Sequence, residues 1–515
     1  MGVCGECSVL VDGVQRRACL EYAREGAEIF PMQPLAPARA GGEKPLFQER
    51  RAISTPDILI VGAGPAGLAG ARLAASAGLK VLVVDERSQG GGQYFKQPGS
   101  GFHIDSHRID SQFAKGACRI TEAQAAGVRF LFEATVWSAF PPNELVVSDP
   151  TGTFEIKASR IILSPGAYER AHIFPGWTIP GVMTTGAAQT LLRGSQTAPG
   201  RRVLVAGNGP LNLQVASELV RSGVDVVALA ELAPPPWKAP PLATLAMLWN
   251  APGLVWEGAR HLAALSSAGI PIYSSHVLVS AEGDEKVRRG TIARVDANGA
   301  VLAGSQKSFD VDSICMGYGF LAQNEMARAL GCTHRLGETG GLVTERDRDG
   351  RTSVPEVFVA GDAASLGGAK IAEAQGMISG AAAAADLGFQ VSRSAIYAAK
   401  RLLKRHGAFQ NALWTVYRAP PPPDLTEANV LICRCEEVDL AGVGAALDEK
   451  LRGLGAIKRV SRLGMGRCQG RYCSVKLAEL VERQCGEAIP TDDYFAPRSP
   501  FKPVTIGTVV DASEM

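Results

Sequence analysis

Two similar β-α-β units constrain the fold of this chain more than any other feature of its sequence. The first begins at Ile58 with ILIVGAGPAGLAGARLAASAGLKVLVVDE, and the second begins at Arg202 with RVLVAGNGPLNLQVASELVRSGVDVVALAE. In each unit an apolar run typical of a buried parallel strand precedes a glycine turn, an Ala- and Leu-rich helix and a second apolar run that ends in an acid. Further strands are predicted at 160–163, 313–316 and 357–360. This alternation of strands and helices predicts an α/β fold with doubly wound parallel sheets.

The first glycine turn has the spacing of a dinucleotide-binding site. Gly62, Gly64 and Gly67 form G-x-G-x-x-G between a strand and a helix. In this motif the first glycine permits the tight turn, the second lets the backbone approach a pyrophosphate, and the third lets the helix pack on the sheet. The helix N-terminus adds N–H donors for the anion. Asp85 ends the second strand and is expected to accept hydrogen bonds from the adenosine ribose, with Glu86 as the neighbouring alternative.

Two later segments indicate which nucleotide this turn holds. The run IILSPG ends at Gly166, and the run VFVAGD ends at Gly361 and Asp362, before a helix predicted from Ala369. With the first turn, they resemble the two-dinucleotide-binding-domain flavoproteins of the glutathione reductase type. The resemblance implies bound FAD, with Asp362 hydrogen-bonded to the ribityl chain and the turn at Ala369 aimed at the isoalloxazine ring. A helix N-terminal cap is the alternative role for Asp362.

The segment that follows the first unit lacks a feature of the disulfide reductases in that family. It reads SQGGGQY over residues 88–94 and contains no cysteine, whereas the reductases carry a redox-active pair near this point. We therefore expect that no disulfide receives electrons here. Gly91, Gly92 and Gln93 are expected to line the flavin cavity instead.

The second glycine turn departs from the pattern of the first. Gly207 and Gly209 are present and Glu231 ends the second strand, but Asn212 stands where the third glycine is expected. An acid at that strand end favours NAD over NADP through the ribose 2′-hydroxyl, whereas a side chain at the third position hinders close packing of the helix on the sheet. Two interpretations stay open: a working NAD(P) site, and a Rossmann-like scaffold that has lost its ligand.

Four of the eleven cysteines form a C-x-C-x32-C-x4-C tetrad: Cys433, Cys435, Cys468 and Cys473. Four thiolates in two close pairs suit either a [2Fe–2S] cluster or tetrahedral zinc, and disulfides are rare in cytosolic chains. Iron–sulfur is favoured because a flavin that accepts two electrons needs one-electron carriers to serve a one-electron partner, and zinc has no redox role. The segment resembles bacterioferritin-associated-ferredoxin-like [2Fe–2S] domains, although these usually end in C-x2-C.

Three further cysteines lie near the N-terminus: Cys4, Cys7 and Cys19. They resemble the end of a ferredoxin domain with the pattern C-x4-C-G-x-C-x11-C, whose first cysteine would precede Met1. The cluster is therefore incomplete as the sequence stands. Either the natural start lies upstream of Met1 or the domain has lost its cluster, and three intact ligands favour the first explanation.

Two long runs extend the resemblance over nearly the whole chain: PGAYERAHIFPGWTIPGVM from Pro165 and GMGRCQGRYC from Gly464. They resemble the α subunits of multisubunit amine dehydrogenases and oxidases of the opine oxidase, hydrogen cyanide synthase, D-hydroxyproline dehydrogenase and sarcosine oxidase type. The resemblance implies that a D-amino-acid-oxidase-like β subunit oxidises the amine, so that this chain needs no catalytic residue of its own. It also implies that electrons pass from FAD to the tetrad, and it allows an FMN at the subunit interface.

Two other functions are compatible with the same residues. The first is a self-contained NAD(P)H-dependent FAD oxidoreductase that uses Gly207, Gly209 and Glu231. The second is a zinc-stabilised flavin-binding scaffold without a redox role.

Charge and domain order complete the prediction. The 53 Lys and Arg nearly balance the 51 Asp and Glu, so nothing predicts a nucleic-acid surface, and no apolar run approaches the roughly 18 residues of a membrane span. We expect a cytoplasmic hetero-oligomer with an unidentified electron acceptor. The expected domains are a partial ferredoxin-like segment (1–30), a linker (31–55), the first part of the FAD domain (56–195), an inserted NAD(P)-like domain (196–310), the second part of the FAD domain (311–395), a helix and proline-rich linker (396–424), a small helical [2Fe–2S] domain (425–490) and a tail (491–515).

Overall fold

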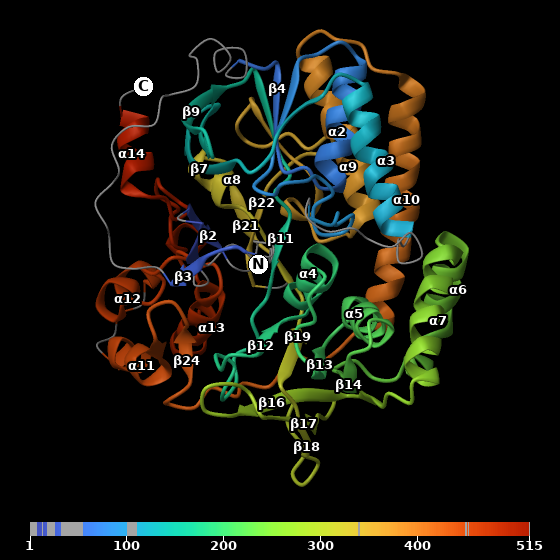
Figure 1. Cartoon of the computed structure of the whole chain (residues 1–515), viewed down its shortest axis with the longest axis vertical. Coiled ribbons are helices and arrows are strands. Elements are labelled where there is room, and N and C mark those ends of the chain that lie inside the picture. The colour runs from blue at the N-terminus through green and yellow to red at the C-terminus, as the bar shows by residue number, and fades with distance from the viewer. Residues whose placement is uncertain are drawn as a thin grey trace.

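Two parallel sheets form the centre of the molecule, one above the other in the view of Figure 1. The computed structural model describes residues 8–12, 14–17, 26–31, 55–99, 111–337, 340–448, 451 and 453–513. Cys4, Cys7, Cys19 and nearly all of the expected linker lie outside these residues. The two sheets confirm the α/β class predicted from the repeated units.

The first sheet contains the unit that begins at Ile58. Its five strands are parallel and follow the order β23-β10-β4-β5-β6. They span Val357–Val359 (β23), Arg160–Leu163 (β10), Ile58–Val61 (β4), Val81–Val84 (β5) and Arg129–Leu131 (β6). Every residue of β4 and β5 is buried, which explains their uninterrupted apolar sequences.

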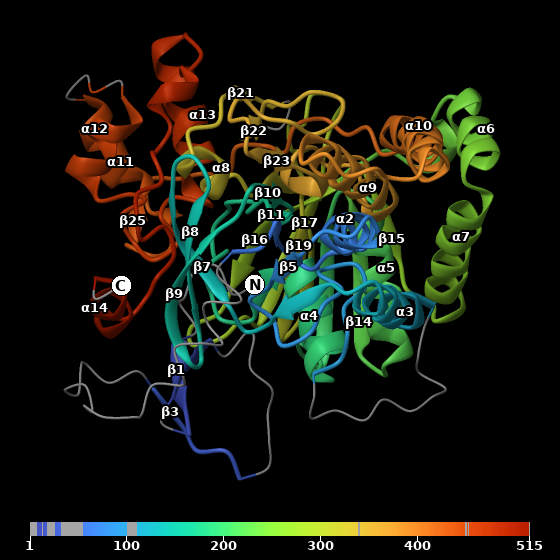
Figure 2. The same ribbon diagram turned by 90° about the horizontal axis from the view of Figure 1, so that it is seen from above.

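Different layers cover the two faces of this sheet (Figures 1 and 2). The helical layer consists of α2 (Pro65–Ser76), α3 (Ser111–Ala125) and α9 (Ala369–Asp386). The other layer is an antiparallel meander of β7 (Thr135–Phe140), β8 (Glu144–Asp149) and β9 (Gly152–Lys157). Along β4, Ile58 and Ile60 belong to the apolar cluster under the helices, whereas Leu59 and Val61 belong to the cluster under the meander.

Helices α2 and α9 touch backbone to backbone. A Cβ on Gly376 would lie 2.0 Å from the carbonyl oxygen of Ala66, and a Cβ on Gly70 would lie 2.7 Å from that of Gly376. Small residues are therefore required where the two helices meet, which accounts for the Ala- and Gly-rich sequence of both. The contact holds the start of α9 close to the first glycine turn.

The second sheet contains the unit that begins at Arg202. Its parallel strands follow the order β12-β19-β13-β14-β15 and span Val182–Thr184, Ser313–Gly317, Arg202–Gly207, Asp225–Glu231 and Ile272–Ser274. Its helical elements are α4 (Thr185–Ser195), α5 (Pro210–Arg221), the short helix η2 (Pro236–Lys238), α6 (Pro241–Asn250) and α7 (Pro252–Ser267). Because β19 pairs with both β12 and β13, the second sheet extends beyond the expected range of 196–310 at both ends.

Small antiparallel elements surround the two sheets. The pairs and meanders are β1 (Ser8–Val11), β2 (Val14–Arg17) and β3 (Ile29–Pro31); β11 (Ala167–Glu169) and β20 (Phe320–Ala322); β16 (His276–Glu282), β17 (Arg289–Arg294) and β18 (Lys307–Asp310); and β21 (His334–Leu336) and β22 (Leu342–Thr344). Two short helices, α8 (Glu325–Ala329) and η3 (Gly361–Ala363), follow β20 and β23. The β11–β20 pair joins the two segments that connect one parallel sheet with the other.

The C-terminal part packs against the body of the molecule. After α10 (Arg393–Val416) it consists of β24 (Leu431–Cys433), β25 (Val438–Asp439), α11 (Leu440–Asp448), α12 (Leu454–Ser461), α13 (Cys473–Cys485), η4 (Thr491–Asp493) and α14 (Ile506–Ser513). Ile432 and Leu477 belong to the same apolar cluster as Phe174 and Leu204 of the body. The indole N–H of Trp177 donates to the carbonyl oxygen of Leu431 at 2.7 Å. Among the helices of the described ranges, none is long and apolar enough to cross a membrane.

Candidate flavin cradle, second nucleotide turn and cysteine tetrad

The first turn, Gly62–Gly67, has no room for side chains at two of its glycines. A Cβ on Gly67 would lie 1.8 Å from the carbonyl oxygen of Gly62, and a Cβ on Gly62 would lie 2.4 Å from that of Ser164. The Ser164 hydroxyl, at the end of β10, donates to the carbonyl oxygens of Val61 at 3.0 Å and Gly62 at 3.1 Å. The strand end and the turn are thereby locked together. Helix α2 starts directly at this turn without a side-chain cap, so its first N–H groups face the place expected for a pyrophosphate.

The structure separates the two acids that could serve the ribose. Asp85 turns toward the glycine turn, where its carboxylate accepts hydrogen bonds from the backbone N–H groups of Ala63 at 2.7 Å and Arg87 at 2.9 Å. Burial raises the pKa of Asp85, and these N–H donors oppose the shift. Glu86 is engaged elsewhere, in an ion pair of 2.7 Å with Lys502. Of the two acids, Asp85 is therefore the one at the first turn, and its contact with a ribose stays a prediction.

The glycine-rich segment after β5 crosses directly over the first turn. The N–H of Gly91 donates to the carbonyl oxygen of Ala63 at 2.8 Å, and a Cβ on Gly92 would lie 2.7 Å from the Cα of Gly64. The side chain of Gln93 is exposed. These contacts bring the segment to the place where the sequence predicts it, and its contact with a flavin stays a prediction.

Asp362 and its neighbours lie at the start of α9. The Asp362 carboxylate accepts hydrogen bonds from the N–H groups of Gly367 at 3.1 Å and Gly368 at 3.3 Å, and burial raises its pKa. The N–H of Gly361 donates to Gln375 at 2.9 Å. Asp362 thus supports the loop before α9, which is close to the capping role considered from the sequence. Gly166 follows strand β10, and its carbonyl oxygen accepts a hydrogen bond from the backbone N–H of Gln323 at 3.0 Å. Ala369 is the first residue of α9, as predicted.

Replacing Asp362 distinguishes its two roles. We expect Asp362→Ala to bind FAD about tenfold more weakly, because a charge-assisted hydrogen bond to a ribityl hydroxyl contributes on the order of 1.5 kcal/mol. Asp362→Asn keeps an acceptor oxygen for the loop and should bind closer to the wild type. Calorimetric titration of the apoprotein with FAD measures the affinity, and thermal unfolding of the apoprotein reports on the loop. An alanine variant that melts earlier yet binds FAD normally would leave only the capping role.

Asn212 fills the place of the third glycine in the second turn, Gly207–Asn212. Its buried amide donates to the carbonyl oxygen of Gly317 at 2.9 Å and accepts from the hydroxyl of Thr185 at 2.8 Å. A Cβ on Gly207 would lie 2.5 Å from this amide nitrogen. Hydrogen bonds of the amide therefore hold α5 on the second sheet, in place of the direct approach that a glycine permits.

Backbone N–H groups of neighbouring residues surround the Glu231 carboxylate. It accepts from the N–H groups of Gly209 at 3.1 Å and Ala233 at 3.0 Å, and it is largely buried. Burial raises the pKa of Glu231 to about 7. An acid so placed holds the turn together.

The C-terminal end of α10 lies over the second turn. The indole ring of Trp414 is so close to Gly209 that a Cβ there would come within 3.5 Å of it. The side-chain amide of Asn208 donates to the carbonyl oxygen of Tyr417 at 3.2 Å. No sequence motif predicts this contact, because α10 is about 200 residues away in the chain.

The four C-terminal cysteines come together in two pairs. The Cys473 thiol is hydrogen-bonded to Cys433, which lowers the pKa of Cys433 to about 6, and Cys468 is similarly paired with Cys435. The pKa of Cys473 is raised by its hydrogen bond with Cys433, by burial and by the charges on the other three sulfurs. The N–H of Gly464 points to the sulfur of Cys433 at 3.5 Å. Between residues 431 and 485 the chain thus gathers all four cysteines of the tetrad.

This donor set can be compared with the groups that it is expected to hold. Within the described ranges, no three His, Cys, Asp or Glu side chains already stand at the spacing of a metal site. The four sulfurs nevertheless lie within electrostatic reach of one another, and backbone N–H groups point at Cys433 and Cys468. Four thiolates with N–H donors fit a [2Fe–2S] cluster, and the sulfurs alone also fit zinc.

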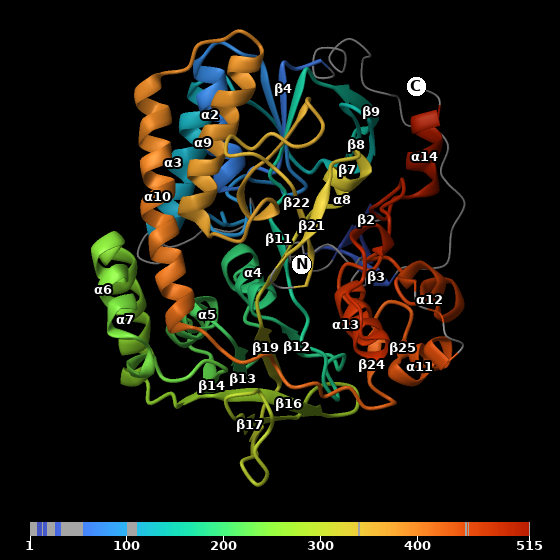
Figure 3. The ribbon, with the colours of Figure 1, turned by 180° about the vertical axis from the view of Figure 1, so that it is seen from behind.

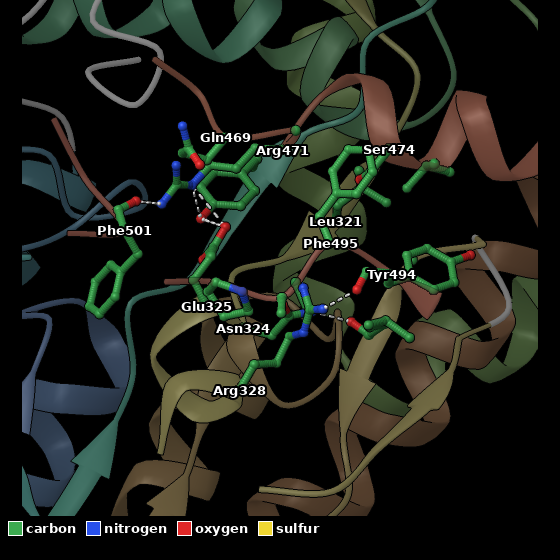
Figure 4. Close-up of a pocket in the computed structure, with 18 of the residues that line it drawn as sticks. Leu321, Asn324, Glu325, Arg328, Gln469, Arg471, Ser474, Tyr494, Phe495 and Phe501 are labelled. Atoms are coloured by element: carbon green, nitrogen blue, oxygen red, sulfur yellow. Dashed lines mark hydrogen bonds and ion pairs between the residues drawn. The ribbon is translucent and has the colours of Figure 1, made fainter. Parts of the chain in front are cut away.

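Arg471 connects the loop of the tetrad to the flavin side of the molecule, and the sequence interpretation missed it. Its buried guanidinium lies 2.8 Å from Glu325 of α8 and donates to the hydroxyl of Tyr168 at 3.0 Å. It also donates to the carbonyl oxygens of Cys468 at 2.8 Å and Phe501 at 2.7 Å (Figure 4). The sequence signal for Arg471 was local, because it stands between the two cysteines of the C-x4-C loop.

An open pocket lies beside this network (Figure 4). Asn324, Arg328 and Tyr494 line part of it, and the guanidinium of Arg328 donates to the carbonyl oxygen of Tyr494 at 3.1 Å. Residues of the two glycine turns are absent from its lining. The pocket therefore belongs to the junction between the C-terminal part and the body.

Comparison with known proteins agrees with this geometry. Residues 56–385 match the pyridine nucleotide-disulphide oxidoreductase family, and residues 429–512 match the sarcosine oxidase A3 domain. Fold and site together define an FAD-dependent oxidoreductase. An opine oxidase subunit from Rhizobium meliloti is 30% identical over 473 residues, which cover 87% of this chain and 86% of that protein. The chain belongs to the family of flavoprotein subunits of multisubunit oxidases and dehydrogenases that includes this opine oxidase subunit.

Two further proteins are similar to this chain, the first in sequence and the second in fold. Hydrogen cyanide synthase subunit HcnB of Pseudomonas aeruginosa is 28% identical over 459 residues, 87% of this chain and 96% of that protein. The crystal structure of L-proline dehydrogenase from P. horikoshii has the same fold, with a TM-score of 0.68 and 21% identity over 98% of this chain and 87% of that one.

Proposed function

We propose that this chain is the electron-transferring subunit of an amine or amino-acid dehydrogenase complex. A D-amino-acid-oxidase-like β subunit oxidises the amine, and this chain takes up the electrons on FAD and releases them singly through an iron–sulfur cluster at the cysteine tetrad. The related proteins named above are subunits of opine oxidase and hydrogen cyanide synthase, which supports a hetero-oligomer. Which amine or imino acid is oxidised depends on the β subunit.

The observation that carries this proposal is the contact between the tetrad and the flavin side of the body. Arg471 belongs to the loop between Cys468 and Cys473, and its partner Tyr168 lies two residues after Gly166. When bound, FAD accepts a pair of electrons and a [2Fe–2S] cluster passes them on one at a time. The residues of this chain join the two regions through the buried ion pair of Arg471 with Glu325 and the partly exposed ion pair of Arg170 with Glu479.

The second turn argues against the alternative, in which NAD(P)H reduces the flavin. Its N–H groups are already used, since that of Gly209 goes to Glu231 and that of Asn208 goes to Gly317 at 2.8 Å. A pyrophosphate needs such donors at the start of the helix, and Trp414 lies across their approach. A nicotinamide cofactor would have to displace the end of α10.

An anaerobic absorbance titration separates the two functions. The whole purified chain, with its FAD content determined first, is treated with NADH, then NADPH, then dithionite. We expect neither nucleotide to bleach the flavin within minutes and dithionite to bleach both the flavin band and the iron–sulfur shoulder. Rapid bleaching by NADH or NADPH would overturn the proposal and make the chain a self-contained reductase.

A further inference from the structure

Helices α6 and α7, which follow one another with a bend at Ala251 and are called the hairpin here, expose an unusual amount of apolar surface together with the short helix η2 before them. Trp237, Trp249 and Trp256 are 81%, 86% and 69% exposed, and Leu242 and Leu245 of α6 are 77% and 60% exposed. We call these five residues the hairpin surface. Isolated exposed apolar residues are ordinary, but three indole rings and two leucines on adjoining elements mark a contact with something apolar.

The opposite side of the hairpin is already occupied. Met247 of α6 and Leu254 of α7 pack on a small apolar cluster that contains Phe409 and Leu413 of α10. The guanidinium of Arg405 donates to the last carbonyl oxygen of α6. The hairpin is therefore anchored to α10 by one side, and its exposed residues are not there to complete that packing.

The hairpin stands at the edge of the molecule away from the tetrad. Figures 1 and 3 show α6 and α7 at one edge and α11, α12 and α13 at the opposite one, and Figure 2 agrees. The hairpin surface is thus separate from the junction proposed for electron transfer. Whatever covers the hairpin surface is therefore different from the contacts at the tetrad.

Positive charges predominate around the hairpin surface. Helix α6 carries no charged residue, and its only polar side chains are Thr244 and Asn250. Between residues 387 and 423, which include α10, there are six Lys or Arg and no Asp or Glu. Lys238 and Arg260 add positive charge next to two of the tryptophans, against a single acid, Glu257. An apolar surface flanked by basic residues fits an occupant that is apolar inside and negatively charged outside.

We propose that the hairpin surface docks the protein on an anionic lipid bilayer. Tryptophan rings prefer the boundary between headgroups and acyl chains, and amphipathic helices lie in that plane with their apolar face inserted. Lysines and arginines beside the inserted face pair with anionic headgroups. A protein partner would instead need hydrogen-bonding groups around an apolar centre, and α6 offers almost none. The proposed contact with the membrane is peripheral, and it does not depend on the electron-transfer function proposed above.

Sedimentation with vesicles tests this proposal on the whole chain. Wild-type protein is spun with vesicles of phosphatidylcholine alone and with vesicles that contain roughly one third phosphatidylglycerol. We expect clear binding to the anionic vesicles, weaker binding to the neutral ones and a blue shift of tryptophan emission on binding. Addition of salt should reduce binding to the anionic vesicles.

Three variants assign the binding to named residues. Trp249→Ser with Trp256→Ser should lower the partition coefficient by about tenfold or more on both vesicle types, since two inserted rings are lost. Arg401→Gln with Lys404→Gln should lower it by about tenfold on anionic vesicles only. Val509→Ser, an exposed apolar residue on α14 at another part of the surface, is the matched control and should bind like the wild type.

Two results would overturn the proposal. One is absence of binding to either vesicle while the protein is folded and loaded with flavin. The other is a wild-type partition coefficient in the double tryptophan variant. Burial of the same tryptophans by self-association or by a β subunit, without any lipid binding, would assign the hairpin surface to a protein partner instead.

Discussion

Gly67→Ala protein is expected to purify without its yellow flavin. A Cβ at this position would stand 1.8 Å from the carbonyl oxygen of Gly62, and neither atom can rotate away because the backbone fixes the position of both. The first turn must open, which also disturbs its contact with Ser164. Overpacking of this kind costs on the order of 2–3 kcal/mol, enough to deform the turn within a domain of this size. The ratio of released flavin to protein, measured after denaturation, gives the occupancy.

Gly64→Ala separates flavin binding from folding. Its backbone has φ −77°, and a Cβ would meet nothing closer than the Cα of Gly92 at 3.9 Å, so the apoprotein accommodates the methyl group. The same methyl group would stand where the backbone approaches a pyrophosphate. We expect this variant to fold with wild-type thermal stability and to bind FAD at least tenfold more weakly.

Gly258→Ala is the matched control for both variants. This glycine lies in α7 with nothing within 4 Å of its Cβ position, so alanine should leave flavin content unchanged and add about 0.5–1 kcal/mol to the free energy of unfolding. Full flavin occupancy in both Gly64→Ala and Gly67→Ala would show that FAD is not bound at the first turn.

Cys468→Ser is expected to remove the iron–sulfur signal and leave the flavin in place. Cys468 is buried and belongs to one of the two sulfur pairs, so the variant leaves three thiolates where a [2Fe–2S] cluster needs four. The flavin is expected at the first sheet and its turns, to which Cys468 contributes no side chain. Iron and acid-labile sulfide analysis, with electron paramagnetic resonance of the reduced protein, measures the cluster.

Cys485→Ser provides the comparison within the same domain. This cysteine ends α13, outside the tetrad, and its replacement should leave iron, sulfide and flavin at wild-type levels. Iron that persists in Cys468→Ser would contradict the assignment of the tetrad. Zinc without iron in the wild-type protein would instead support the flavin-binding scaffold.

The amino-acid sequence determines the parts of this protein that depend on near neighbours in the chain. Each glycine turn, with its strand, helix and terminal acid, lies within about 30 residues, and the helix at Ala369 begins where its sequence indicates. Backbone sterics and strand burial act over such distances, so Gly62, Gly67 and the two parallel sheets could be predicted. The C-x-C and C-x4-C pairs are local in the same sense.

The tertiary structure alone decided how those parts are used. Glu86 is drawn away from the first turn by an ion pair with Lys502, more than 400 residues away, and Trp414 at the end of α10 lies over the second turn. The link between tetrad and flavin side follows from Arg471 meeting Glu325. Such contacts depend on which distant surfaces pack together, and no local pattern encodes them. The sequence therefore identifies the binding motifs, whereas packing determines which of them stay accessible and which are joined.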